Sequence, residues 1–199
     1  MPEHTQQADS SRKRYRTAAV LVLLAVALSI AIWIVSRPTT PYPDFVRYRD
    51  MDAYPPLAEG VRRAERVVLY EGLPHQLFEP DELRSELNSH HTVRIGGYPF
   101  YKQPLELAAS DSQWLKEWFC RPQSFREMPQ GWAKACGGFH PDFCIEWQSG
   151  TEAYDVLVCF NCREVFCIGP DAMLNCDIAE DFEQVERILA GYNKNRPPQ

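Results

Sequence analysis

The chain has 199 residues and a formal net charge of −6, from 21 basic and 27 acidic side chains. Five basic and two acidic side chains lie in residues 1–37, so the remainder carries 16 basic and 25 acidic side chains, a net charge of −9. This acidity argues against nucleic acid as a partner, because phosphate contacts need clustered Lys and Arg. About 160 residues suffice for one domain with a hydrophobic core.

An uncharged apolar run extends from Thr17 to Ser36. It is flanked by basic side chains: Arg12, Lys13, Arg14 and Arg16 before it, and Arg37 after it. A helix of this run would be roughly 30 Å long, which matches the hydrocarbon core of a bilayer. Because basic flanks favour the cytoplasmic side, we expect a cytoplasmic N-terminus (1–16), a transmembrane helix (17–36) and an extracytoplasmic C-terminal part in the cell membrane. A cleaved signal peptide is the alternative, although the apolar run continues past Ala31.

The next residues, 37–60, are rich in Pro and Tyr, and we interpret them as an extended tether before a domain over 61–199. Residues 66–70 are an apolar run typical of a strand. Pro80, followed by two acidic residues, indicates a short helix that ends near Asn88. Residues 90–95 alternate and then meet two glycines, which predicts another strand.

Two amphipathic helices and a set of strands fill the C-terminal half. Ser110 and Gln113 have the spacing of a capping box before an apolar helical face, and Asp177 and Glu180 repeat that spacing before another. Between them, from Phe143, the period is two, which indicates three successive strands. The whole pattern predicts an α+β fold: an N-terminal transmembrane helix, then one domain with an antiparallel sheet of about five strands packed by two or three helices.

All seven cysteines fall within the last 80 residues: Cys120, Cys136, Cys144, Cys159, Cys162, Cys167 and Cys176. Outside the cytosol thiols tend to pair, so each of them is a candidate for a structural disulfide. Seven is an odd number. At least one thiol must therefore remain free, bind a metal or pair with another chain.

The pair Cys159 and Cys162 is the strongest local signal for chemistry. If the two residues open and close a β-turn, their thiols can form a disulfide or chelate one metal ion. A zinc site would need two further ligands, for which the nearby candidates are Cys136, His140, Cys144 and Cys167; no cofactor at all is the simpler expectation. A redox role is disfavoured, because a strand rather than a helix is expected after the second cysteine.

His140 and Asp142 follow two glycines just before the predicted hairpin. They could form a general base for a cysteine nucleophile, Cys136 or Cys144. The simpler interpretation, which we favour, is that both side chains order the loop through bonds to the backbone.

Four segments resemble a family of uncharacterised secreted or membrane proteins from planctomycete-type bacteria. They are Tyr70-Glu71-Gly72-Leu73-Pro74-His75, Gly97-Tyr98-Pro99-Phe100, Cys136-Gly137-Gly138-Phe139-His140-Pro141-Asp142 and Cys159-Phe160-Asn161-Cys162-Arg163-Glu164. The resemblance implies a bacterial cell envelope setting and no particular activity.

The expectation from sequence is therefore a single-pass membrane-anchored, extracytoplasmic domain that serves as a binding or structural module of the cell envelope. The alternative is a thiol-dependent or zinc-dependent activity centred on the turn at residues 159–162.

Overall fold

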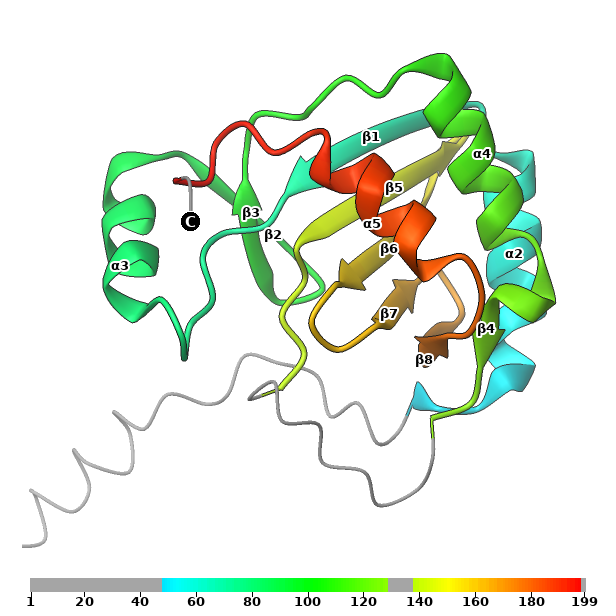
Figure 1. Cartoon of the computed structure of the whole chain (residues 1–199). Coiled ribbons are helices and arrows are strands. Elements are labelled where there is room, and N and C mark those ends of the chain that lie inside the picture. Colours follow the sequence, from blue (N-terminus) through cyan, green and yellow to red (C-terminus); the bar gives the residue numbers. More distant parts are fainter. Residues whose placement is uncertain (1–47, 129–137, 198–199) are drawn as a thin grey trace, which may run out of the picture. The chain divides into compact units, whose positions relative to one another are not determined.

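The computed structural model describes residues 48–128 and 138–197. Two short 3-10 helices, η2 (Met51–Ala53) and η3 (Pro122–Ser124), accompany four α-helices: α2 (Tyr54–Arg63), α3 (Pro80–Ser89), α4 (Ala109–Phe119) and α5 (Phe182–Ala190). The strands are β1 (Arg66–Glu71), β2 (Thr92–Ile95), β3 (Tyr98–Tyr101), β4 (Phe125–Arg126), β5 (Phe143–Ser149), β6 (Glu152–Cys159), β7 (Glu164–Ile168) and β8 (Met173–Ile178). Figure 1 shows the helices arranged around one central sheet.

The central sheet has six strands in the order β1-β5-β6-β7-β8-β4, and each neighbouring pair is antiparallel. Strands β5 to β8 form a meander, in which each strand pairs with the next along the chain. Strands β2 and β3 form a separate antiparallel hairpin.

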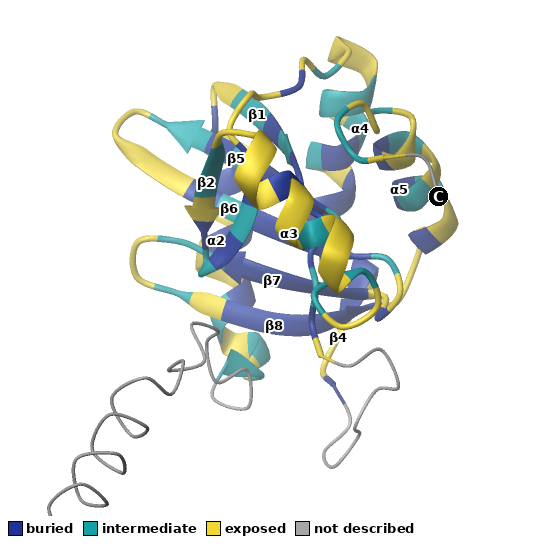
Figure 2. Ribbon diagram, turned by 90° about the vertical axis from the view of Figure 1, so that its left-hand side faces the viewer, coloured by how far each residue is buried: buried dark blue, intermediate teal, exposed yellow. Residues whose placement is uncertain are grey.

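The two faces of the sheet carry separate clusters of buried side chains. One face packs against α2, α4 and α5 through large side chains that include Leu57, Trp118 and Val185. The other face packs against the β2–β3 hairpin through Phe100, Leu157 and Phe166. Alternate residues of each central strand supply the two faces, so β7 and β8 are buried along most of their length (Figure 2).

The structure is α+β, but the predicted set of elements, a membrane-spanning helix with about five strands and two or three further helices, was wrong. The main sheet has six strands and the described residues contain four α-helices. No helix within 48–128 and 138–197 is long and apolar enough to cross a membrane. The predicted span from Thr17 to Ser36 lies outside the described residues.

Helix α2 (Tyr54–Arg63) begins within the stretch predicted to be an extended tether, 37–60, and continues past its predicted end. The helix forms despite its two prolines because proline is tolerated in the first helical turn. Leu57 and Val61 are buried, so packing stabilises the helix. Neither predicted capping box forms. The α4 cap is Ala108 and the α5 cap is Asp181, neither with a side-chain cap hydrogen bond, and Ile178 belongs to β8.

Candidate functional site

A pocket of about 1140 Å³ opens beside the turn that joins β6 to β7. Its walls come from the segment before α3, from α3 and α5, from the β6–β7 turn and from the C-terminal segment. The lining mixes aromatic rings with ionisable groups: Phe78, Phe160 and Phe182 on one hand, and His75, Glu79, Glu82, His140, Asp142, Arg163, Glu186 and Arg196 on the other. Such a mixture allows both burial of apolar surface and polar recognition.

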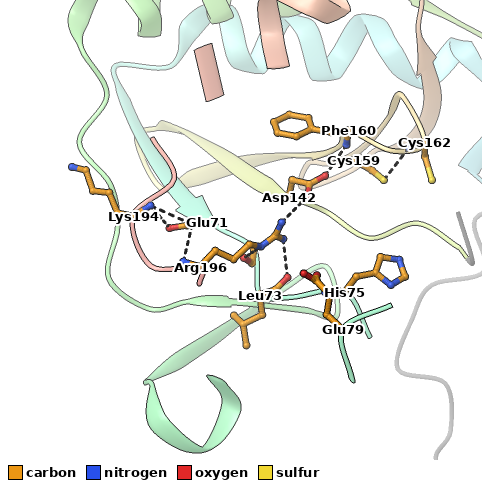
Figure 3. A network of polar contacts seen from close by, with 11 residues as sticks. Glu71, Leu73, His75, Glu79, Asp142, Cys159, Phe160, Cys162, Lys194 and Arg196 are labelled. Carbon is orange, nitrogen blue, oxygen red and sulfur yellow. Dashed lines mark hydrogen bonds and ion pairs between the residues drawn. The ribbon is translucent and has the colours of Figure 1, made fainter. Parts of the chain in front are cut away.

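The buried carboxylate of Glu71 holds the C-terminal segment in place. Glu71 ends β1 and is fully buried. Its two oxygens accept hydrogen bonds from the backbone N–H groups of Lys194, Asn195 and Arg196, at 2.8 to 3.3 Å, and from the Asn195 side-chain amide at 2.9 Å (Figure 3). Several charge-assisted bonds compensate the cost of burying this charge.

Arg196 then joins the C-terminal segment to the start of β5. Its guanidinium lies 3.0 Å from Asp142 Oδ1 and also donates to the carbonyl oxygens of Gly72 and Leu73 (Figure 3). The other Asp142 oxygen accepts the backbone N–H of Phe160 at 2.7 Å. Asp142 therefore ties the C-terminal segment to the β6–β7 turn, on one side of the pocket.

His75 and His140 stand next to each other at the pocket wall, with ring centroids 4.5 Å apart. His75 Nδ1 accepts hydrogen bonds from the backbone N–H groups of Leu77 and Phe78, which places its proton on Nε2. Burial lowers the pKa of His140 to about 4; the charge of Asp142 opposes this shift, and the charges of Arg196 and His75 add to it. His140 is therefore neutral at pH 7.

The simpler interpretation of His140 and Asp142, as residues that order the loop, agrees with these contacts. Asp142 bonds to the backbone of the β6–β7 turn, and the partly buried His140 ring bonds to the backbone of Leu73. Both act from the loop before β5, as their place in the sequence suggested.

The cysteines of the β6–β7 turn are not paired with each other. Cys159 is a buried free thiol whose sulfur accepts the backbone N–H of Cys162 at 3.4 Å. Burial, together with the charge of Asp142, raises the pKa of Cys159 to about 12. Cys162 is disulfide-bonded, but not to Cys159. Cys136 lies outside the described residues.

The remaining predicted disulfide candidates are free thiols as well: Cys120, Cys144, Cys167 and Cys176. Three of them are buried within the sheet, where side chains alternate between the two apolar clusters. Burial raises the pKa of each of these four thiols. Free cysteines in such positions behave as small apolar side chains.

The zinc candidates do not assemble into one site in the part of the chain that the structure describes. No three His, Cys, Asp or Glu side chains there are placed to hold one metal ion. Cys159 and His140 are close, but the contact is a backbone N–H of His140 directed at the Cys159 sulfur.

Sequence reasoning missed Glu71 and Arg196 as parts of this site. A signal for Glu71 was present: it stands two residues after Leu69, at a position that alternation assigns to the buried side of β1. A charged residue at such a position requires a partner. Arg196 lies in a short polar segment after the last helix, and no pattern distinguishes it from a solvated arginine.

Comparison of the chain with protein-family models, with curated proteins and with solved structures gave no match.

Proposed function

We propose that this domain is a ligand-binding module, held at the outer side of a cell membrane, and that its ligand occupies the pocket between α3, α5 and the β6–β7 turn. The observation that carries the proposal is the pocket of about 1140 Å³ beside a fixed polar network. Small-molecule sites have volumes of roughly 300–1,000 Å³ and combine apolar walls with a few placed polar groups.

The network supports binding because it fixes the polar groups before a ligand arrives. Asp142 and Arg196 are only 15% and 13% exposed, and each is bonded to backbone on another segment. Groups that are already in place lose little conformational freedom on binding, which favours affinity. Exposed Phe78, at 60%, offers an apolar contact at the rim.

A thiol-dependent activity has less support. The nucleophile of such an activity is a thiolate, and thiolates form where a positive environment lowers the pKa. Cys159 lies beside the carboxylate of Asp142 and is 1% exposed, and its raised pKa keeps it protonated at neutral pH.

The test is a fragment screen on the full-length protein, followed by backbone amide NMR. We expect fragments that shift the signals of His75, Asn161 and Arg163 together. Replacing Ala190, an exposed α5 residue on the pocket wall, by Trp should abolish this response. Ala109→Trp, at an exposed position of α4 and outside the pocket lining, is the matched control and should retain the response. Shifts scattered over the surface, or unchanged by Ala190→Trp, would contradict the proposal.

Membrane attachment is part of the proposal and rests on the run from Thr17 to Ser36 alone. The full chain should remain in the membrane pellet after carbonate extraction, and protease added outside intact cells should cleave the C-terminal domain. A chain that is released by carbonate would count against attachment through this segment.

A further inference from the structure

The guanidinium of Arg196 is held by three acceptors that belong to other parts of the chain. Nε donates to Gly72 O at 3.1 Å, Nη1 to Asp142 Oδ1 at 3.0 Å and Nη2 to Leu73 O at 2.8 Å. All three nitrogens are therefore used. Arginine presents a planar fork of N–H groups, whereas the lysine ammonium is a single point, so this arrangement selects a guanidinium over an ammonium.

The remaining bonds to the segment go to groups that any peptide has. Glu71 accepts three successive backbone N–H groups, of Lys194, Asn195 and Arg196. Only the Asn195 amide adds a side-chain contact. The acceptors therefore bind a stretch of main chain and one arginine side chain, as a peptide-binding site does.

The guanidinium and one of its acceptors, Asp142, border the pocket. Asp142 and Arg196 both line the pocket, as do Asn193 and Pro197 on either side of the held residues. If Arg196 left, the carboxylate of Asp142 would face the pocket without its cation, and the carbonyl oxygens of Gly72 and Leu73 would lose the guanidinium as a donor. A desolvated carboxylate without its partner is unfavourable, so the vacated position favours another cation of the same shape.

We propose that Asp142 and the carbonyls of Gly72 and Leu73 form a guanidinium subsite at the edge of the pocket, occupied by the chain's own Arg196, while Glu71 binds the adjoining main chain. The subsite accepts the arginine side chain of a peptide ligand when Arg196 is absent. The inference rests on the proposed function, since it names a ligand group for the same pocket. A tethered side chain competes at an effective concentration in the millimolar range, so the subsite is closed to weak ligands in the unmodified protein.

The test uses the full-length Arg196→Ala variant, which retains the backbone donors to Glu71. The probe is Nα-acetylarginine amide, and Nα-acetyllysine amide is the control of equal charge. We expect the arginine amide to bind the variant with a Kd in the millimolar range, to shift the amide signals of Gly72 and Leu73, and to raise the Tm. The lysine amide should bind at least tenfold more weakly, and the wild type should bind neither.

Adding Asp142→Asn to the variant should abolish binding of the arginine amide. If Arg196→Ala does not fold, Arg196→Gln, which keeps much of the packing of the stem, replaces it. Equal binding of the two amides to the folded variant, or no binding of either, would overturn the subsite.

The outcomes separate the two proposals. Arginine binding without any fragment response in the pocket would support the subsite and overturn the wider ligand site. A fragment response that Ala190→Trp removes, without arginine binding, would do the reverse.

Discussion

The carboxyl group of Asp155 should make the stability of this domain depend on pH. Asp155 on β6 pairs directly with Glu146 on β5, so the two carboxyl groups lie on the same face of the sheet. Burial, and then the charge of Glu146, raises the pKa of Asp155 to about 7. One Asp155 oxygen is buried and has no hydrogen bond to the described residues.

The sign follows from the proton that the folded state retains. Between about pH 4 and pH 7 the folded protein keeps a proton on Asp155, which the unfolded chain has released. The contribution to stability is therefore complete below about pH 4 and is lost as the pH rises through 7. A shift of about three pKa units, at about 1.36 kcal/mol per unit, corresponds to about 4 kcal/mol.

Replacing Asp155 by Asn removes the titration and keeps the shape of the side chain. We expect the free energy of unfolding of the wild type, relative to that of Asp155→Asn, to fall by about 3 to 4 kcal/mol between pH 4 and pH 8. Urea unfolding followed by tryptophan fluorescence at pH 4, 6 and 8 measures the difference. Asp171→Asn, in an exposed loop, is the matched control. If the stabilities of the wild type and of Asp155→Asn change in parallel with pH, Asp155 is not protonated in the folded state and the reasoning is refuted.

Three further predictions concern packing, thiols and the C-terminal segment. Gly60→Ala should destabilise the domain by about 1 to 3 kcal/mol in urea unfolding, because a Cβ there would overlap the ring of Tyr154; an unchanged midpoint would show that the ring moves freely. Iodoacetamide should label Cys120 alone among the described free thiols of the native protein, and mass spectrometry that finds Cys159 labelled would contradict its burial. Glu71→Gln should cost about 2 kcal/mol and speed amide hydrogen exchange in residues 194–196, and unchanged exchange would mean that Glu71 does not hold the segment.

The elements whose patterns are local could be predicted from sequence. The alternation from Phe143 onward identified β5, β6 and β7, and the apolar run at 66–70 identified β1, because side chains of these strands face two apolar clusters. Strand β8 was missed, because most of its residues are buried and the periodic signal is lost. Strand β4 has only two residues, too few for a pattern.

The site depends on contacts that sequence distance hides. His140 and Asp142 could be identified as a cluster, yet their main partners, His75 and Arg196, are far away in the chain. Cysteine spacing suggested a disulfide between Cys159 and Cys162, whereas Cys159 is a free, buried thiol. Spacing shows that two thiols can meet, but burial decides whether they act as apolar side chains.

The sheet order has a consequence for how this protein is made. Strand β1 lies at one edge and pairs with β5, and helices α3 and α4, the β2–β3 hairpin and strand β4 come between them in the chain. A ribosome therefore releases the apolar run Arg66–Tyr70 well before its partner strand exists. During that interval the nascent chain exposes an unpaired, aggregation-prone strand, so we expect its yield in cells to depend on chaperones that bind early. The meander from β5 to β8 has no such delay, since each strand follows its partner directly.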